Sequence, residues 1–424
     1  MGLTASFPFP LIGGLHARFR RGPLNLITDV PGVRVAHVDI RGKLDEPRRA
    51  VRTGVTVIMP GSGHPFRDKF TAGAHVINGF GKSVGLMQIA ELGTLETPIV
   101  LTNTLSVGAG FIGAARYMLD ITPEIGETTG TVNPIVLECN DSPISDLRAM
   151  AVAPEDVTRA IKLAQSAGDA FAEGAVGAGS GMTCYGLKGG IGSASRIVEA
   201  GGTGYTLGCL AMTNFGSLCD LTLAGCAVGA EINAALENDR TVVIHPFGDA
   251  EPRDECGDSD DSGYSSDSDG KTQDRGSVII VAATDAPLSD RQLTRLAKRA
   301  QSGIARTGGY TGNGSGEIAV AFSTANRVPH DPPAEPRVIQ TSPESIMDTF
   351  FAAMVSAVEE SILSSMEHAG TTPARRGGVI MGLNDALSKV SPLCAAAEGA
   401  NPAPRRKWRL TLSHDGSEGY SLSS

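Results

Sequence analysis

The sequence has few aromatic residues and no motif that is typical of a metal site. Phe, Trp and Tyr make up 5% of the 424 residues, so the core must be built mainly from Ala, Val, Ile and Leu. The eight histidines show no H-E-x-x-H or other ligand spacing, so we expect neither a metal ion nor another cofactor. The seven cysteines form no C-x-x-C pair and lie mostly in apolar segments, which favours reduced core thiols in a cytoplasmic protein.

The sequence also lacks a basic region and a long apolar run. The net charge is −10, but residues 249–274 hold ten acidic and two basic residues, so the remainder is close to neutral. A chain without a basic patch gives no indication of nucleic-acid binding. No apolar run reaches the length that spans a bilayer, and the Arg18 to Arg21 cluster follows the first apolar stretch instead of preceding it, unlike a signal peptide. We therefore expect neither a nucleic-acid partner nor a membrane.

The acidic segment 249–274 is rich in Ser, Asp and Gly and has very few apolar residues. Such a composition cannot bury enough apolar surface to offset the entropy of ordering the chain. We expect residues 249–274 to form a disordered insertion.

The junction Gly276-Ser277 separates this segment from the apolar run Val278-Ile-Ile-Val-Ala-Ala283, which predicts a buried strand. A serine hydroxyl is a weak nucleophile at neutral pH, whereas a free α-amino group has a pKa of about 7.7–8.0 and can act as its base. Backbone cleavage before Ser277 would thus create a better catalyst than the intact chain. Taken alone, the dipeptide favours an ordinary turn before a strand over a cleavage site.

A second polar motif, Thr311-Gly-Asn-Gly-Ser-Gly-Glu317, precedes the apolar run Ile318-Ala-Val-Ala-Phe322. Residues i and i+2 of an extended segment face the same side, so Ser315 and Glu317 would present a hydroxyl and a carboxylate together. A carboxylate that holds a second serine can orient and polarise the first. The alternative is a glycine-rich hairpin with polar tips.

These motifs, together with several others in the same order along the chain, resemble the DmpA/BapA group of self-cleaving aminopeptidases. This group comprises the L-aminopeptidase/D-esterase and β-peptidyl aminopeptidase enzymes of peptidase family S58. The resemblance spans roughly residues 10–370. It is carried by Ile27-Thr-Asp-Val-Pro-Gly-Val-Arg-Val-Ala-His37, Ala74-His-Val-Ile-Asn-Gly79, Gly181-Met-Thr-Cys-Tyr-Gly-Leu-Lys-Gly-Gly-Ile-Gly-Ser-Ala-Ser-Arg196, Asp274-Arg-Gly-Ser-Val-Ile-Ile-Val-Ala-Ala-Thr-Asp-Ala-Pro-Leu288 and Ser315-Gly-Glu317.

The resemblance implies a role for each matching residue. Ser277 matches the nucleophile and new N-terminus, and Gly276 matches the last residue of the larger chain. Ser315 and Glu317 match the serine and glutamate that complete the catalytic set. Two further positions match. Asn214 corresponds to the asparagine whose amide helps to stabilise the oxyanion, and Glu138 to a carboxylate that receives the free amine of the substrate, although an ordinary strand-end glutamate would look the same.

The expected fold class follows partly from periodicity and partly from the resemblance. Alternating strand and helix patterns give α+β, and the resemblance implies a four-layer αββα sandwich of the N-terminal-nucleophile type. We expect one catalytic domain over residues 1–390, cleaved into chains 1–276 and 277–424, with a loose tail over residues 391–424. The resemblance also implies a homotetramer of cleaved protomers that acts on short peptides or on amino-acid amides and esters.

One departure from the family pattern is found after Asn140-Asp141. Many bacterial relatives have Gly-Tyr there, and their tyrosine contributes to the active site, whereas this chain has Ser142-Pro143. Proline offers neither a hydroxyl nor a backbone donor. Two alternatives to the aminopeptidase remain open: an acyltransferase of the ornithine acetyltransferase type, which normally uses threonine where this chain has Ser277, and a non-catalytic scaffold that retains the fold.

Three helices are predicted from caps and apolar spacing. Ser289-Asp290 opens a helix that extends to about Arg306. Ser342-Pro343-Glu344 opens a second, with Phe350, Met354, Val358 and Ile362 on one face, and a third begins near Pro154.

Overall fold

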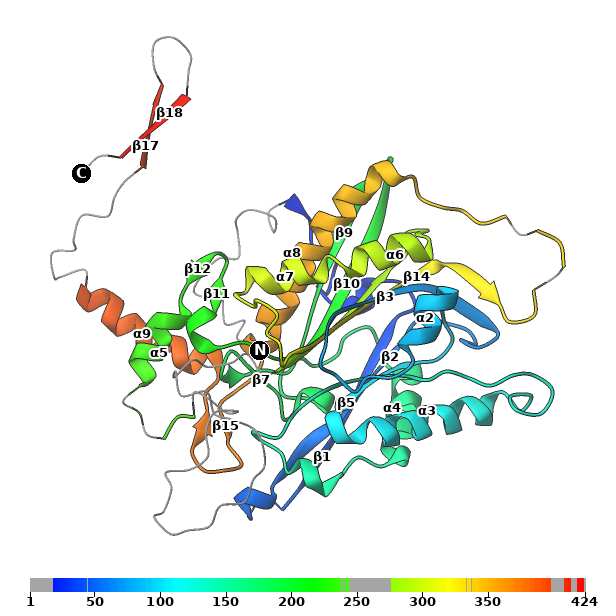
Figure 1. Ribbon diagram of the computed structural model, residues 1–424, viewed down its shortest axis with the longest axis horizontal. Helices are drawn as coiled ribbons and strands as arrows, with labels where there is room; N and C mark the ends of the chain where they lie inside the picture. Colours follow the sequence, from blue (N-terminus) through cyan, green and yellow to red (C-terminus); the bar gives the residue numbers. More distant parts are fainter. Residues whose placement is uncertain are drawn as a thin grey trace.

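The computed structural model describes residues 18–43, 45–237, 239, 241–243, 276–332, 334–336, 338–397, 408–412 and 418–422. The acidic insertion expected at 249–274 therefore lies outside the described residues. Two β-sheets stacked between two layers of helices form the body of the molecule (Figure 1). The structure confirms the four-layer αββα sandwich.

The smaller sheet has four strands in the order β1-β2-β5-β6, and the larger has six in the order β4-β3-β14-β13-β10-β9. The smaller sheet consists of β1 (Arg34–Gly42), β2 (Val51–Met59), β5 (Ile99–Asn103) and β6 (Ile135–Cys139). The larger consists of β4 (Thr94–Leu95), β3 (Asp68–Gly79), β14 (Gly316–Pro329), β13 (Ser277–Thr284), β10 (Thr203–Asn214) and β9 (Ile191–Ala200). Strand β13 lies inside this sheet, parallel to β14 and antiparallel to β10.

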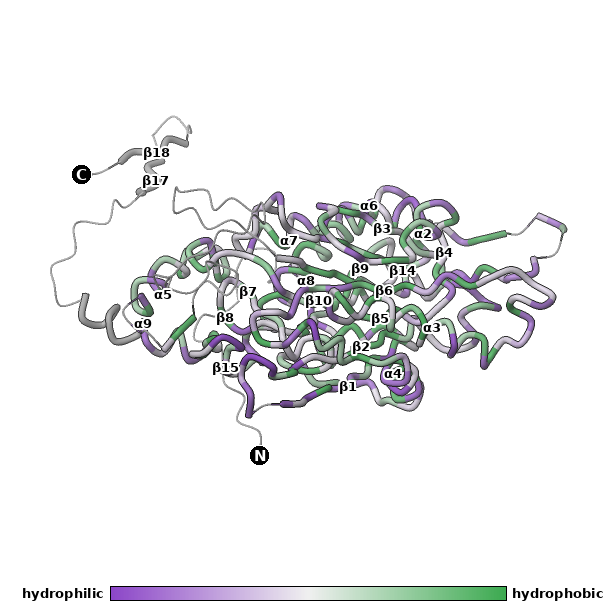
Figure 2. Tube along the Cα trace, turned by 60° about the horizontal axis from the view of Figure 1, so that its bottom comes forward, coloured by the Kyte–Doolittle hydropathy of each residue, from purple (hydrophilic) through white to green (hydrophobic). Residues whose placement is uncertain are grey.

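The core between the two sheets follows from the two-residue period of the strands. Ile279, Val281 and Ala283 of β13 face the smaller sheet, whereas Val278, Ile280 and Ala282 pack against helices on the other side. Every residue of β13 is buried, which explains why its sequence is an unbroken apolar run after Ser277. The predicted strand at 278–283 is confirmed. Figure 2 shows hydrophobic segments near the labels β5, β6, β10 and β14 in the interior of the molecule.

Helices cover the outer faces of both sheets. Helices α3 (Val107–Ile121) and α4 (Pro154–Ser166) pack on the smaller sheet, and α6 (Asp290–Ala297), α7 (Ala300–Arg306) and α8 (Met347–Glu367) pack on the larger. The side chain of Ser289 caps α6 by accepting a hydrogen bond from the Gln292 backbone N–H at 3.2 Å. The helix expected to extend from Ser289 to Arg306 is divided in two, because the backbone N–H of Arg299 donates to Leu296 O with the tighter i to i+3 spacing.

Shorter elements surround this sandwich. They are α2 (Leu86–Leu92), α5 (Gly229–Leu236) and α9 (Leu383–Ala397), with the paired strands β7 (Thr183–Cys184) and β8 (Leu187–Lys188), β11 (Thr222–Leu223) and β12 (Cys226–Ala227), β15 (Thr372–Pro373) and β16 (Val379–Ile380), and β17 (Trp408–Leu412) and β18 (Glu418–Leu422). The boundary expected at residue 390 falls within α9. The loose character predicted for the tail stays a prediction.

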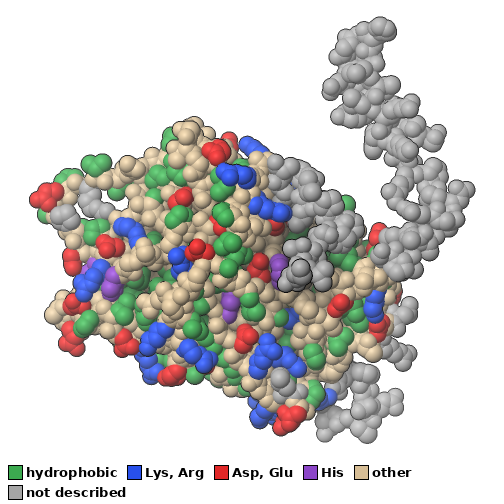
Figure 3. Space-filling view, turned by 180° about the vertical axis from the view of Figure 1, so that it is seen from behind, with side chains coloured by type: hydrophobic (Ala, Val, Ile, Leu, Met, Phe, Trp, Pro, Cys, Tyr) green, Lys and Arg blue, Asp and Glu red, His purple; other side chains and the backbone are tan. Residues whose placement is uncertain are grey.

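The described helices and the surface seen in Figure 3 can be examined for features that bind a membrane or nucleic acid. None of the helices in the described ranges is both long enough and apolar enough to cross a membrane. On the face seen in Figure 3, basic and acidic side chains are interspersed. This face presents no continuous basic surface.

Candidate active site

Ser277 lies at the first position of β13, between two strands that carry other predicted site residues. It pairs with Asn214, the last residue of β10, on one side and with Gly316, the first residue of β14, on the other. Its side chain is 6% exposed, and by strand alternation it faces the smaller sheet, as Ile279 does. Positions 214, 277, 315 and 317 therefore meet at one end of the larger sheet.

The carbonyl group of Gly276 accepts two hydrogen bonds. The hydroxyl of Ser277 donates to it at 2.7 Å, and the backbone N–H of Gly316 donates to it at 2.9 Å. A side chain at position 276 does not fit, because its Cβ would lie 2.2 Å from the carbonyl oxygen of Asn214. The packing of β13 against β10 thus requires glycine directly before Ser277.

Gly316 leaves open the space in front of the Ser277 hydroxyl. A Cβ at position 316 would lie 2.9 Å from Ser277 Oγ and 2.8 Å from the carbonyl oxygen of Phe80. The glycine between Ser315 and Glu317 therefore keeps a side chain away from the hydroxyl and also brings the segment after β3 close to it.

Ser315 and Glu317 are joined directly. The hydroxyl of Ser315 donates to Glu317 Oε1 at 2.9 Å, and the hydroxyl of Thr311 donates to Oε2 at 2.8 Å. Both Ser315 and Glu317 are fully buried. The Asn78 amide donates to the carbonyl oxygens of Ser315 and Gly312, which fixes the glycine-rich loop. The carboxylate is therefore held by two hydroxyl groups in a site closed to bulk water.

The amide of Asn214 is held on one side and left without a partner on the other. Its Oδ1 accepts hydrogen bonds from the Thr183 backbone N–H at 3.1 Å and from the Thr183 hydroxyl at 3.3 Å. Because a backbone N–H can only donate, this contact assigns the oxygen and places Nδ2 on the other side. Nδ2 is buried and has no hydrogen-bond acceptor among the described residues. A buried amide donor without an acceptor is costly unless it serves a ligand or a reacting group.

Glu138 lies near the end of β6, on the smaller sheet. Its Oε1 accepts a hydrogen bond from the Lys82 backbone N–H at 2.8 Å, and its Oε2 accepts one from the Thr104 hydroxyl. The backbone at Gly81 separates this carboxylate from Gly316, since a Cβ at position 81 would lie 3.5 Å from Oε1 and 3.9 Å from Gly316 Cα. Glu138 thus approaches the Ser277 end of the larger sheet from across the interface.

Positions 214, 277, 315 and 317 lie at one end of the larger sheet, but in the described part of the chain the structure does not join Ser277 directly to the pair of Ser315 and Glu317. Among the described residues, the hydroxyl of Ser277 donates to its own preceding carbonyl and not to Ser315 or Glu317. Sequence reasoning missed Thr183 and the role of Thr311 in holding the site. Thr311 stands in the same glycine-rich motif as Glu317, which is a usable signal, whereas nothing local links Thr183 to a residue 31 positions away.

The segment Ser142-Pro143 is fixed to the hairpin of β15 and β16. The Arg375 side chain donates to the Ser142 carbonyl at 3.0 Å, and the Arg375 backbone N–H donates to the Pro143 carbonyl at 3.0 Å. Ile144 packs against Ala374 and Ile380 of the same region. This segment binds Arg375 through its backbone carbonyls, and neither Ser142 nor Pro143 supplies a phenol.

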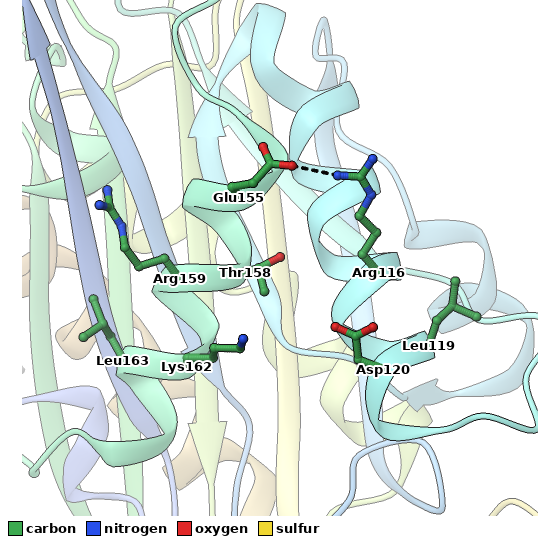
Figure 4. A pocket seen from close by; sticks show the side chains of 8 residues that line it. All are labelled: Arg116, Leu119, Asp120, Glu155, Thr158, Arg159, Lys162 and Leu163. Atoms are coloured by element: carbon green, nitrogen blue, oxygen red, sulfur yellow. Dashed lines mark hydrogen bonds and ion pairs between the residues drawn. The ribbon is translucent and has the colours of Figure 1, made fainter.

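A surface cavity of about 600 Å³ lies between α3 and α4, on the outer side of the smaller sheet (Figure 4). It is lined by Arg116, Leu119, Asp120, Glu155, Thr158, Arg159, Lys162 and Leu163. Arg116 and Glu155 form an ion pair at its rim, with 2.8 Å between Nη1 and Oε1. The cavity contains none of the residues predicted to act, so we place the candidate active site at Ser277.

Comparison with known proteins agrees with this placement. The family model described as peptidase family S58 matches residues 25–380. The beta-peptidyl aminopeptidase BapA of Sphingosinicella xenopeptidilytica is 35% identical over 395 residues, which cover 91% of this chain and 92% of that protein.

Two solved structures extend the comparison to the fold. The PH0078 protein of Pyrococcus horikoshii OT3 is 45% identical, with a TM-score of 0.75 over 89% of this chain and 96% of that one. The L-aminopeptidase D-Ala-esterase/amidase of Ochrobactrum anthropi, described as a variant of the Ntn hydrolase fold, is 31% identical, with a TM-score of 0.74 over 90% of this chain and 99% of that one. On these grounds, the chain belongs to peptidase family S58, a family of aminopeptidases.

Proposed function

We propose that this chain cuts its own backbone between Gly276 and Ser277 and then acts as a serine aminopeptidase. Its substrates would be short peptides and amino-acid amides or esters with a free amine. The observation that carries the proposal is the pair of hydrogen bonds on the Gly276 carbonyl, one from the Ser277 hydroxyl and one from the Gly316 backbone N–H. This carbonyl has a nucleophile beside it and a donor on its oxygen.

Self-cleavage would follow from this arrangement. Ser277 Oγ attacks the carbonyl carbon of Gly276, and the Gly316 N–H stabilises the negative charge that develops on the carbonyl oxygen. The bond from that carbon to the Ser277 nitrogen breaks, the hydroxyl proton is transferred to the nitrogen, and an ester joins the two chains. Water then hydrolyses the ester, which leaves Gly276 with a carboxylate and Ser277 with a free amine and a free hydroxyl.

Hydrolysis of a substrate would reuse the same hydroxyl. The new amine of Ser277 acts as the base, and Ser315 with Glu317 orients the protons around it. The buried Nδ2 of Asn214, which lacks an acceptor among the residues that the structure describes, donates to the oxyanion of the substrate. Glu138, across Gly81 from the site, binds the substrate's free ammonium group. Binding of the substrate's free amine by Glu138 next to the nucleophile would limit the reaction to removal of one N-terminal residue at a time.

The names of the relatives point to two classes of N-terminal residue. The Sphingosinicella enzyme is named a beta-peptidyl aminopeptidase, and the Ochrobactrum enzyme an L-aminopeptidase. We propose that p-nitroanilides of β-alanine and of L-alanine are both hydrolysed, and a side-by-side rate measurement ranks them. The homotetramer and the cytoplasmic location stay predictions.

The intact mass of the purified protein under denaturing conditions tests self-cleavage. We expect two fragments, residues 1–276 and 277–424, and N-terminal sequencing of the smaller one should give Ser-Val-Ile-Ile. A single uncut chain that persists over days, without hydrolase activity, would refute the proposal and favour the scaffold alternative.

Replacing Asn214 with alanine tests the proposed oxyanion donor. We expect kcat to fall by about 100- to 1,000-fold with little change in KM, because the donor acts on charge that exists only in the transition state. Self-cleavage should persist, since the Gly276 carbonyl is bound by Gly316 and not by Asn214. Kinetics on an amino-acid p-nitroanilide measures the first effect, and intact mass measures the second.

Asn25→Ala is the matched control. Asn25 is a half-buried asparagine whose amide donates to Glu360 and accepts from the backbone N–H of Ser195, in the middle of edge strand β9. Its loss should lower stability and leave kcat close to wild type. An Asn214→Ala protein with wild-type kcat would remove Asn214 from the mechanism.

A further inference from the structure

Lys188 places a fully buried ammonium group directly behind the candidate oxyanion donor. It is the last residue of β8, and its side chain has no exposed surface. Nζ donates to three backbone carbonyls, at 3.2 Å to Gly179, 2.9 Å to Met182 and 2.6 Å to Gly189. The roles proposed above do not use this charge. Burying an ammonium group costs free energy unless hydrogen bonds and other charges compensate it.

One of these three carbonyls connects Lys188 to Asn214. The carbonyl of Met182 and the N–H of Thr183 belong to a single planar peptide group, and this N–H donates to Asn214 Oδ1 at 3.1 Å. The ammonium group therefore acts on one end of a peptide whose other end holds the Asn214 amide. Hydrogen bonds in such a chain polarise one another. The ammonium group that donates to the Met182 oxygen therefore makes the Thr183 N–H, and then the Asn214 amide, a stronger hydrogen-bond donor.

The same loop is closed by a second contact. The backbone N–H of Gly189 also donates to the Met182 oxygen, at 3.1 Å. The carbonyl next to Thr183 is thus held by two donors, and the peptide cannot turn away from Asn214 without breaking both. Lys188 and Gly189 together fix the orientation of the Thr183 N–H.

Asp141 is an acidic residue buried beside the same segment. Its carboxylate is fully buried and packs against Gly181. Burial raises the pKa of Asp141 to about 7 and lowers the pKa of Lys188 to about 7. The Asp141 charge acts against the second of these shifts and favours the ammonium form.

We propose that Lys188 is a positioning residue for catalysis, which aligns and polarises the Asn214 amide through the Met182-Thr183 peptide. The inference rests on the proposed function, because it needs Asn214 to donate to the oxyanion. Lys188 touches neither the substrate nor the reacting atoms. Its effect should appear in kcat and depend on the presence of the Asn214 side chain.

The test compares Lys188→Met with Lys69→Met in the full-length protein, with rates on β-alanine p-nitroanilide expressed per cleaved chain. Lys69 is also largely buried and pairs with Glu96 at 2.7 Å, but it lies near the opposite end of β3, roughly 30 Å along the strand from Asn78. We expect Lys188→Met to lower kcat by about 10- to 100-fold with KM within about 3-fold of wild type. Lys69→Met should lose stability and keep its kcat.

A double-mutant cycle separates positioning from a general loss of structure. In the Asn214→Ala background, Lys188→Met should lower kcat by less than about 3-fold, because the amide it acts on is gone. An equal loss in both backgrounds would overturn the proposal. So would a Lys188→Met chain that is as stable as Lys69→Met but stays uncut, since Gly316 holds the scissile carbonyl.

Asp141→Asn keeps the proposal testable if Lys188→Met does not fold. This variant retains the side-chain shape and removes a charge that favours the ammonium form of Lys188, and we expect kcat to fall by several-fold with KM unchanged. Wild-type kcat in Asp141→Asn, or in a folded Lys188→Met, would refute this role of Lys188 while leaving the aminopeptidase proposal intact. An uncut and inactive wild-type protein would instead refute the proposed function itself.

Discussion

Replacing Ser277 with alanine is expected to give a single uncut chain of 43.8 kDa that hydrolyses no amino-acid amide. The hydroxyl of this residue is 2.7 Å from the Gly276 carbonyl oxygen and is the group that would attack the adjacent carbon. Without it, neither the backbone nor an external substrate has a nucleophile. Both losses should come from one change because one oxygen atom performs both reactions.

Intact mass and steady-state rates measure the two effects separately. The variant should remain folded, since alanine fits wherever Ser277 does and the hydroxyl donates only to the neighbouring carbonyl. Circular dichroism and thermal unfolding check this point. A Ser277→Ala protein that still splits after residue 276 would exclude Ser277 as the nucleophile of self-cleavage.

Ser342→Ala is the matched control for the loss of a buried hydroxyl. Ser342 is 6% exposed, as is Ser277, and its Oγ has no hydrogen-bond partner among the described residues. It precedes α8 on the helical side of the larger sheet, away from the candidate active site. This variant should be cleaved and active at wild-type levels.

Much of the fold could be predicted because the signals are local. The strand after Ser277 is an unbroken apolar run, Ser289 stands directly before α6 and caps it, and Pro154 is the first residue of α4. The apolar face of α8 is likewise visible as a four-residue repeat from Phe350 to Ile362, all buried as expected. The break between α6 and α7 has no comparable signal, since no glycine or proline stands at Lys298 or Arg299.

The candidate site divides in the same way. Ser315 and Glu317 could be paired from their spacing, because strand residues two positions apart share a face. The neighbourhood of Ser277 and Asn214 depends on the register between β10 and β13, which joins positions 63 residues apart. Periodicity carries no such register, and here the family resemblance was what pointed to Asn214.

The link from Lys188 to Asn214 lies beyond both kinds of reasoning. It passes through the Met182-Thr183 backbone peptide, so no pair of side-chain types in the sequence indicates it. A buried lysine in a glycine-rich segment would be judged unfavourable from sequence alone. Only the positions of the Gly179, Met182 and Gly189 carbonyls reveal what compensates the buried charge.

Replacing Glu317 with glutamine is expected to leave a folded protein with strongly reduced turnover of amino-acid amides. The carboxylate accepts hydrogen bonds from the hydroxyls of Ser315 and Thr311, and both contacts can survive in part with an amide. The substitution removes the negative charge that, in the proposed mechanism, stabilises the protonated amine of Ser277. We expect kcat to fall by about 100-fold or more, in line with loss of a general acid–base group.

Glu96→Gln separates this effect from instability. Glu96 is also almost fully buried and accepts hydrogen bonds from Asn133 while it pairs with Lys69, so its neutralisation removes a comparable internal charge far from Ser277. Breaking a buried pair costs a few kcal/mol, so Glu96→Gln should be less stable than Glu317→Gln and yet retain its turnover. Turnover in Glu317→Gln equal to that of wild type, per cleaved chain, would remove Glu317 from the mechanism. The Ser277 hydroxyl would then have to depend on its own amine alone.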